Sequence, residues 1–555
     1  MSNRLVTDDN FVAQMTEANN WLAQIAAGGT VTKLDAVYTA MLDGTNTTRI
    51  FKQWYPQSAD GNTTKYQRLE RWFKMLATAY AGKKYTLKYA LITSSDPAMT
   101  PMDDLAGKTA APVVTDASTN VSDWTEEDCM TWYVRANALS LADGTMNVTY
   151  IEGEDGFDIT GSAAPVYTFS LALWIREWSD SNGNYKSWAT TNPGGYWPYE
   201  GDIAPDNVKR AMTWHPTFCG GLTADGKLTS GAGLASTIEI SAVNGLAKAK
   251  LWNTYEGLWN DCDAKWLLDM WQLRHFNLGN SDILEGCTNY SIDVTVAVAE
   301  TGVKRVLISA ASLSSFIVGS TVCLSSTARG GTRTFWNKRI SSIETVTVDG
   351  TSYTAVYIET DSTFDTTAGY HLCTLAWFSG STEALPGHSD GSISSTTNGK
   401  YTARVAGIEV LNGTYTIGIE PLWNATANAT SGMDYEAYYC RDSTKLAGAL
   451  TNYTASGIKF TGTATGWQYI KAFFATKLGV LLPSTFGGNS AGWFKSAFFV
   501  SSSAGVRTPW RCGCWGLGGA AGLACASGYS SPSSSLWYGA PRLGGSGKMR
   551  GEWLT

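Results

Sequence analysis

The chain has 555 residues, which is too long for one hydrophobic core and predicts about two to four domains. Only 16% of the residues are charged, against about 25% in average globular proteins. The net charge of −7 makes nucleic acid an unexpected partner, because a phosphate-binding surface needs an excess of Lys and Arg. We expect neither a signal peptide nor membrane insertion, because no charged leader precedes an apolar run and no stretch holds about 18 apolar residues.

Helical periodicity dominates the N-terminal part of the chain. The apolar spacing of FVAQMTEANNWLAQIA predicts one short helix that serves docking or self-association. The stretch YQRLERWFKMLATAYAG predicts a second helix, with Leu69, Trp72, Phe73 and Leu76 on one face. Residues 95–122 are rich in Pro, Ser, Thr and Asp, so we expect a long loop or linker there.

Alternating sequences predict strands from about 128 to 215, such as MTWYVRANAL, MNVTYIEG and VYTFSLALWIREW. The Gly-rich stretch WHPTFCGGLTADGKLTSGAG that comes next predicts a loop segment. Residues 291–380 are strongly β and predict a small barrel or sandwich inserted into the chain, followed by a polar loop at 381–400. Aromatic strands then alternate with Gly- and Ser-rich loops over 401–555.

A further helix is predicted at 261–276, in the stretch DCDAKWLLDMWQLRHF. Its apolar spacing favours one buried face, and Asp261 and Asp263 lie near its N-terminus, where the helix dipole favours negative charge. The residues of the predicted buried face are Trp266, Leu267, Met270, Leu273 and Arg274.

The residue patterns of known catalytic and metal sites are missing from the sequence. Ten Cys are scattered, and only Cys512 and Cys514 lie close together, without C-x-x-C pairs or nearby His, so we expect free, buried Cys and no zinc site. Four His stand singly, and we interpret His215 as a structural residue. Acid pairs such as Asp261 and Asp263 are expected to be solvated, so enzymatic cleavage of cell-wall or surface glycans is a distant alternative.

The most specific sequence lies in three stretches of the C-terminal half. RTPWRCGCWGLGGAAGLACASGYSSPSSSLWYGAPRL spans 507–543, VAGIEVLNGTYTIGIEPLW spans 405–423, and GWQYIKAF with LLPSTFGGNSAGWF lies within 466–494. Taken in their order along the chain, the three stretches resemble phage tail and virion proteins with a formylglycine-generating-enzyme-like C-type lectin fold. The positions that match the C-terminal signature of this family are Arg511, Gly513, Trp515, Pro532, Gly539, Arg542 and Leu543.

The resemblance implies an α+β, β-rich fold class. It implies a C-terminal C-type-lectin-like domain with an inserted small all-β domain, preceded by a mixed N-terminal region that anchors the chain in the virion. The predicted regions are 1–125 for the helical or mixed anchor and linker, 126–215 for a β-rich region leading into the lectin-like domain, 216–290 with 401–555 for the lectin-like domain, and 291–400 for the inserted all-β domain.

The same resemblance argues against an enzyme. The oxidising members of this fold use two Cys at the second and seventh positions after the signature Trp, and these positions hold Leu517 and Gly522 in this chain. Neither residue binds copper or forms a thiol intermediate, so we expect no catalytic residue and no cofactor. Calcium occurs in many lectin-like folds, but the sequence does not support it here.

The loops between 510 and 540 predict a binding role. Their Gly- and Ser-rich runs cannot pack a core, and Tyr, Trp, Ser and Gly are typical of adaptable binding surfaces. Some phage relatives are variable proteins of diversity-generating retroelements, in which Asn-rich template codons are mutated, and Gly528 is one position here that looks like a replaced Asn. The expected ligand-binding residues, which also look like replaced Asn positions, are Leu517, Tyr529, Ser530, Ser533, Ser535, Trp537 and Tyr538.

We therefore expect a bacteriophage receptor-binding or adhesion protein, located in the virion at a tail tip or fibre. Its expected partners are a bacterial cell-surface glycan or protein and other virion proteins. The analogy implies a homotrimer, because fibre and tip proteins gain avidity from such assembly. The alternative is a capsid-decorating, head-fibre or baseplate structural protein with the same fold and no direct receptor role.

Overall fold

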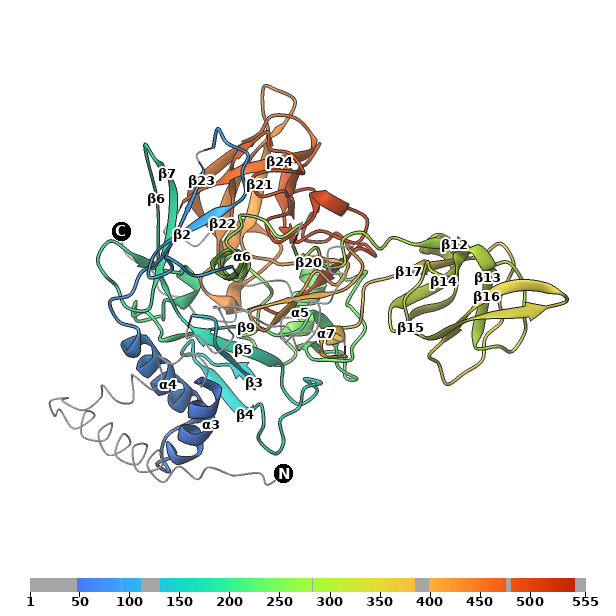
Figure 1. The fold of residues 1–555 in the computed structure, drawn as a ribbon, viewed down its shortest axis with the longest axis horizontal. Coiled ribbons are helices and arrows are strands. Elements are labelled where there is room, and N and C mark those ends of the chain that lie inside the picture. Colours follow the sequence, from blue (N-terminus) through green and yellow to red (C-terminus); the bar gives the residue numbers. More distant parts are fainter. Residues whose placement is uncertain are drawn as a thin grey trace.

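The computed structural model describes residues 47–90, 92–110, 130–281, 283–384, 399–475 and 481–544. Strands make up 38% and helices 14% of the structure, which confirms the predicted β-rich α+β class. A small sheet domain projects from the main body (Figure 1). None of the described helices is long and apolar enough to cross a membrane. The short helix predicted in FVAQMTEANNWLAQIA lies outside the described residues.

The helices are few and two of them stand at the start of the described chain. The α-helices are α3 (Thr47–Gln57), α4 (Lys65–Ala79), α5 (Ala242–Ala249), α6 (Asp261–His275) and α7 (Ser381–Ala384), and the 3-10 turns are Glu200–Asp202, Ala310–Ser312, Ser443–Lys445, Leu450–Asn452 and Gly518–Ala520. The predicted apolar face of α4 is confirmed, because Leu69, Trp72, Phe73 and Leu76 are all fully buried. Trp72 packs edge-on against Trp132, with ring centroids 5.6 Å apart.

A five-stranded sheet, in the order β2-β1-β7-β6-β8, lies on one side of the main body. Its strands are β1 (Tyr85–Tyr89), β2 (Met99–Asp103), β6 (Trp174–Asp180), β7 (Gly183–Ala189) and β8 (Trp197–Pro198). The prediction of a loop over 95–122 was wrong for the residues of β2, because this strand pairs with β1 in antiparallel register. Pro101 is compatible with this strand because β2 is at the edge of the sheet, where one side of the backbone needs no ladder hydrogen bonds.

A four-stranded sheet, in the order β4-β3-β5-β9, packs next to α4 (Figure 1). Its strands are β3 (Tyr133–Ser140), β4 (Met146–Ile151), β5 (Val166–Leu171) and β9 (Met212–Pro216), and a hairpin follows with β10 (Gly220–Leu222) and β11 (Leu228–Ser230). The prediction of a loop for the Gly-rich stretch WHPTFCGGLTADGKLTSGAG was therefore wrong over much of its length, because the stretch contains the end of β9 and the strands β10 and β11. Gly220 serves close packing instead, because a Cβ there would lie 2.3 Å from the backbone oxygen of Pro541.

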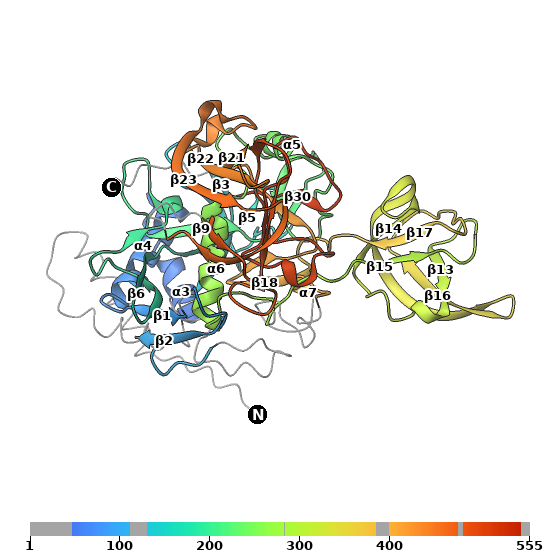
Figure 2. The same ribbon diagram turned by 90° about the horizontal axis from the view of Figure 1, so that it is seen from above.

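The projecting domain is one six-stranded antiparallel sheet, in the order β12-β17-β14-β15-β16-β13, and Figures 1 and 2 show it apart from the main body. Its strands are β12 (Asp293–Thr295), β13 (Arg305–Ser309), β14 (Thr321–Thr327), β15 (Gly330–Val348), β16 (Thr351–Ile358) and β17 (His371–Thr374). It has its own core, which includes Val306, Val322, Leu324 and Val356. All six strands lie within the range 291–400 that the sequence predicted for an inserted domain.

The C-terminal part forms a seven-stranded sheet, in the order β25-β24-β26-β29-β28-β20-β30, and a four-stranded sheet, in the order β23-β22-β21-β27. Their strands, with the separate hairpin β18–β19, are β18 (Ala403–Val405), β19 (Ile408–Val410), β20 (Tyr415–Ile417), β21 (Leu422–Ala427), β22 (Met433–Tyr439), β23 (Thr454–Gly462), β24 (Gly466–Phe473), β25 (Pro483–Phe486), β26 (Ala497–Val500), β27 (Gly505–Arg507), β28 (Trp510–Arg511), β29 (Ala526–Ser527) and β30 (Gly539–Pro541). Leu543 bridges to Leu258, so the end of this part returns to the segment before α6.

Helix α6 occupies the centre of the main body, between the N-terminal and C-terminal elements (Figure 2). The helix was predicted correctly, but the single buried face was wrong, because all 15 of its residues are buried. Three of its carboxylates bind three different sheets: Asp261 binds Arg511 of β28, Asp263 binds His215 of β9, and Asp269 binds Lys186 of β7. The expected solvated acid pair Asp261 and Asp263 is therefore buried and structural. Specific partners allow these charges to leave water.

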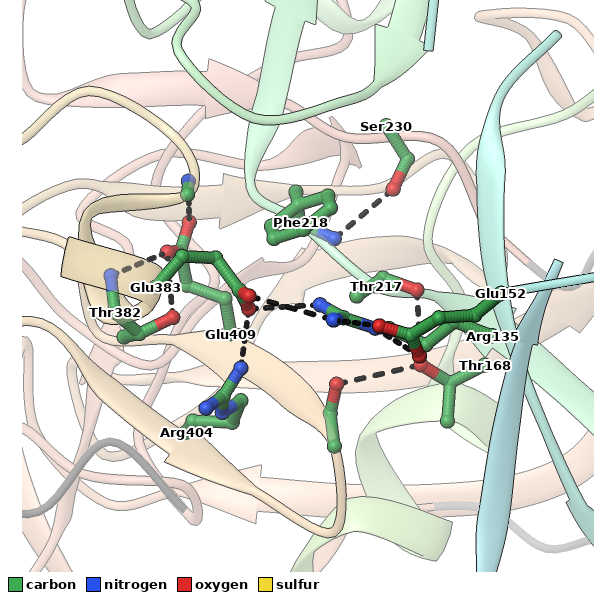
Figure 3. A network of polar contacts seen from close by, with 12 residues as sticks. Arg135, Glu152, Thr168, Thr217, Phe218, Ser230, Thr382, Glu383, Arg404 and Glu409 are labelled. Carbon is green, nitrogen blue, oxygen red and sulfur yellow. Dashed lines mark hydrogen bonds and ion pairs between the residues drawn. The ribbon is translucent and has the colours of Figure 1, made fainter. Parts of the chain in front are cut away.

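A polar network ties the four-stranded sheet to the segment that returns from the projecting domain (Figure 3). Arg135 of β3 donates to Glu152 and, at 2.7 Å, to Glu383 of α7. Arg404 of β18 binds the same Glu383 carboxylate. On the next strand, β19, the buried Glu409 accepts a hydrogen bond from the Thr382 hydroxyl. These charge-assisted bonds fix α7 and β18–β19 against the sheet.

Candidate functional site

The signature residues of the C-terminal stretch lie inside the scaffold. Arg511 and Trp515 are each 1% exposed. Arg542 is also buried and donates to the backbone oxygens of Glu409 at 2.7 Å and Pro216 at 2.8 Å. The glycines allow close approach. A Cβ on Gly513 would lie 2.7 Å from the Ala521 side chain, and one on Gly539 would lie 2.6 Å from the Trp510 ring. These residues therefore pack in the scaffold that carries the loops.

The expected ligand-binding residues differ widely in exposure. Exposed positions are Tyr529, Ser533 and Ser535, and partly buried positions are Leu517, Trp537 and Tyr538. Ser530 is only 3% exposed, so the expectation that it contributes to the surface was wrong: its backbone oxygen accepts a hydrogen bond from the amide of Thr508, directly after β27. Gly528 is also packed inside, because a Cβ there would lie 2.8 Å from the rings of Phe498 and Tyr435.

Trp537 and Tyr538 pack against the scaffold. Their rings meet edge-on at 5.0 Å, and Trp537 also lies 5.3 Å from the buried Trp515. Tyr538 contacts Trp510 of β28 at 5.8 Å. Burial raises the pKa of the Tyr538 hydroxyl. Aromatic contacts of this kind stabilise the fold, so these two side chains contribute only their outer parts to any surface.

The projecting domain reaches over this part of the loops. Arg329, in the turn between β14 and β15, lies 5.1 Å from the Trp537 ring and 5.6 Å from the Trp515 ring. The same guanidinium is held by the backbone oxygen of Thr374 at 2.9 Å. The half of the loop surface around Trp537 therefore faces the projecting domain, through cation–π contacts. The other half, around Tyr529, is open.

A second contact holds the same two parts together. Arg333 of β15 forms a two-bonded ion pair with Glu239, which precedes α5. The backbone oxygen of Glu239 accepts a hydrogen bond from the Ser535 hydroxyl, and its amide donates to the Leu536 oxygen at 3.1 Å. Ser535 is thus exposed to solvent, but its hydroxyl already donates a hydrogen bond within the protein.

The open half contains an aromatic patch, formed by Trp467, Phe499 and Tyr529. Trp467 of β24 lies edge-on to Phe499 of β26 at 5.1 Å, and Tyr529 lies edge-on to the same ring at 5.6 Å. Trp467 is 37% and Tyr529 49% exposed. Among the tryptophans that the structure describes, Trp467 is the only exposed one. An exposed indole next to an exposed phenol offers contact area at low entropy cost.

Sequence reasoning found Tyr529 but missed its two partners. Trp467 is opposite Phe499 in the antiparallel β24–β26 pair, and β26 runs parallel to β29, with Phe499 next to Ser527. The strand register therefore joins residues about 60 positions apart. One signal was available: neighbours on a strand point to opposite faces, so of Phe498 and Phe499 one had to face outward. Phe498 is fully buried, and Phe499 is the outward one.

No group of three or more His, Cys, Asp or Glu side chains within the described ranges is arranged to hold a metal ion. In the same ranges the cysteines are free, and all except Cys514 are buried. His215, interpreted as structural, stacks on Trp266 at 4.2 Å and its Nδ1 bonds Asp263 at 2.7 Å.

Compared with models of known protein families and with curated proteins, the chain shows no match. Fold and site thus define a β-rich α+β protein with an exposed aromatic patch.

Proposed function

We propose that this chain is a bacteriophage virion protein that binds a bacterial surface glycan or protein through the aromatic patch and the neighbouring open loop. The observation that carries the proposal is that two exposed side chains, Trp467 and Tyr529, both pack against the ring of Phe499. The other tryptophans that the structure describes are wholly or partly buried. Aromatic side chains at the surface are typical anchors of protein binding sites. Ser533, exposed on the same loop, adds an adaptable polar group.

The proposed C-type-lectin-like fold is supported by the way the C-terminal part closes. The last strand, β30, runs parallel to β20, and Leu543 bridges to Leu258, so the end of the C-terminal part joins the segment before α6. The absence of oxidase chemistry is supported at Gly522. Its φ of 129° and a Cβ position 2.6 Å from the Ser496 hydroxyl leave no room for a cysteine.

Replacing Trp467 or Tyr529 by Ala is expected to weaken binding of virions to host cells by about 5- to 150-fold, which corresponds to about 1–3 kcal/mol for a binding anchor. Both side chains are exposed, so the variants should fold. Adsorption of variant virions and binding of the purified chain to host cells would be measured. Tyr150→Ala is the matched control, because Tyr150 is a 41% exposed tyrosine on β4 in another sheet. Unchanged adsorption of both Trp467→Ala and Tyr529→Ala would contradict the proposal.

The alternative role, in head decoration or the baseplate, is favoured by one observation. The projecting domain covers the Trp537 half of the loops, so this half already has an intramolecular partner through Arg329. Antibodies against residues 528–535, applied to intact virions, separate the two roles. Labelling of the tail tip with blocked adsorption supports receptor binding, and labelling of the head supports the alternative. Light scattering tests the proposed homotrimer, and a concentration-independent monomer would exclude it.

Diversification of the open loop is part of the proposal. Tyr529 and Ser533 are exposed and accept other side chains, whereas Gly528 and Ser530 are packed and do not. We expect the DNA near this gene to contain a near-identical repeat of the loop sequence and a reverse transcriptase gene. We further expect natural variants to differ at 529 and 533 and to keep 528 and 530. Sequencing of the locus in related phages checks both statements, and a locus without a repeat would exclude diversification.

A further inference from the structure

A cavity of about 290 Å³ lies away from the loop surface, between the five-stranded sheet and the C-terminal sheet. Strands β1, β6 and β7 form one side, β24 and β25 form the other, and α6 contributes to the floor. Its volume is near the lower end of the about 300–1,000 Å³ of small-molecule sites. The cavity therefore fits a ligand of about one ring.

Seven of the residues that line the cavity are aromatic. Trp178 and Tyr185 are cross-strand partners on β6 and β7 and stack at 5.0 Å with an angle of 7°. On the opposite wall, Phe473 meets Phe494 edge-on at 4.8 Å. Trp493, close by, carries the Lys471 ammonium group 4.8 Å from its ring. Aromatic side chains together with polar groups in one cavity are the usual elements of a binding site for a small molecule.

The floor of the cavity is ionic but has no net charge. Glu177, Lys186 and Lys265 line it, and Asp269 of α6 lies directly behind them. Both ammonium groups bind both carboxylates, over distances of 2.7–3.0 Å. Burial alone would raise the pKa of Glu177, but the two lysines outweigh burial and lower this pKa to about 2. Glu177 is therefore an anion at neutral pH, with its charge already balanced.

One acceptor in this floor is left for a ligand. The Lys265 ammonium donates to Oε1 of Glu177 at 2.9 Å, and Lys186 approaches the same oxygen at 3.0 Å. Both of these lysine contacts are with Oε1, which leaves Oε2 as the oxygen at which a ligand hydroxyl would bind. Asp96 and Ser484 supply further polar groups in the lining. A neutral hydroxyl suits Oε2 best, because an ammonium ligand would meet the two lysines and an anion would meet the carboxylates.

We propose that this cavity binds one neutral sugar ring, as a free monosaccharide or as the terminal residue of a glycan. The ring's C–H groups would pack on the aromatic walls, and its hydroxyls would donate to Glu177 and exchange hydrogen bonds with the serines of the lining. This site is separate from the aromatic patch and does not rest on the proposed receptor-binding function. A buried ionic cluster contributes little stability over apolar packing, so its place at the cavity floor fits a binding role.

The test is titration of the purified full chain with glucose, galactose, mannose and N-acetylglucosamine, followed by calorimetry or ligand-observed NMR. At least one sugar should bind saturably below about 10 mM, a concentration range in which weak single-ring ligands bind. Glycine, lysine and glucuronate serve as zwitterionic, cationic and anionic probes. If none of the neutral sugars binds, or if a charged probe binds in their place, the proposal is wrong.

Two variants locate the site. Ala472 of β24 lines the cavity, so Ala472→Trp fills part of it with an indole and should abolish sugar binding while the circular dichroism spectrum stays unchanged. Glu177→Gln should weaken binding by about 10-fold or more, as expected when a charge-assisted hydrogen bond is lost. Binding that survives Ala472→Trp would overturn the assignment. Trp467→Ala should leave sugar binding unchanged, which keeps this test independent of adsorption.

A labelled oligosaccharide with the same sugar at its non-reducing end distinguishes the two sources. If the oligosaccharide competes with the free sugar, the cavity accepts the end of a glycan. If only the free sugar binds, the cavity is closed to longer chains and takes a soluble monosaccharide. Both results support a neutral sugar site.

Discussion

An Arg511→Met variant should lose about 3–5 kcal/mol of unfolding free energy, the usual cost of removing one partner from a buried ion pair. Nε of Arg511 donates to Asp261 at 3.1 Å, and Nη2 donates to the same carboxylate and to the Leu481 oxygen at 2.8 Å. Both charged side chains are 1% exposed. Without the guanidinium, the Asp261 carboxylate is buried with no cation. Urea unfolding followed by fluorescence measures the loss.

The pH dependence of this variant separates an electrostatic cause from lost packing. Burial outweighs the attraction of Arg511 and raises the pKa of Asp261 to about 6. Without Arg511 this pKa must rise further, because the stabilising cation is gone. An acid whose pKa is raised in the folded state makes the protein more stable as the pH falls. Arg511→Met should therefore recover part of its stability between pH 7 and pH 5, and a loss independent of pH would point to packing alone.

Two controls complete the experiment. Arg339→Met removes a two-bonded Arg–Glu pair at the surface, where Arg339 and Glu359 are 40% and 54% exposed, and should cost less than about 1 kcal/mol. Combining Arg511→Met with Asp261→Leu should be less destabilising than the sum of the single changes, because no charge is then left unpaired. Additive effects in this double variant would show that the two residues do not act as a pair.

Local periodicity predicted the elements that bury one face. The spacing of α4 and the alternation of β4 can be read from sequence, because each side chain there faces either core or solvent, whereas β3 is buried along nearly its whole length. α6 departs from this rule, because it is surrounded by three sheets and its polar residues are buried with partners from each. The stretch VYTFSLALWIREW was predicted as strand, but it divides at 172–173 into β5 and β6, which belong to different sheets.

The site was predictable only where it is contiguous in sequence. The composition of the C-terminal loops indicated Tyr529. Which loop side chains are exposed, however, depends on backbone hydrogen bonds that composition does not encode, as the burial of Ser530 shows. The patch also needs Trp467 and Phe499, which only strand register brings together. The cavity floor is less predictable still, because Glu177 and Lys186 come from a hairpin and Lys265 from a helix about 80 residues later.

Acid should destabilise the protein through Glu177. Its pKa is about 2 in the folded state against an ordinary value of 4.5, because Lys186 and Lys265 together outweigh its burial. A carboxylate whose pKa is lowered on folding stabilises the protein fully above its unfolded pKa, and this stability is lost as the pH falls toward the folded value. The difference corresponds to about 3 kcal/mol, lost between about pH 4.5 and pH 2. Urea midpoints measured across this range would show the decline.

The matched variants are Glu177→Gln and Glu359→Gln. Glu177→Gln lacks the titrating group, so its free energy of unfolding should be lower at neutral pH. Between pH 4.5 and pH 2 this free energy should fall by about 3 kcal/mol less than in the unmodified protein. Glu359→Gln removes an exposed carboxylate and should keep the slope of the unmodified protein. If the slopes of all three proteins agree, the acid sensitivity arises elsewhere. A flatter curve for Glu177→Gln alone would show that Lys186 and Lys265 hold this carboxylate ionised at the cavity floor, which is the charge state that a sugar hydroxyl requires of it.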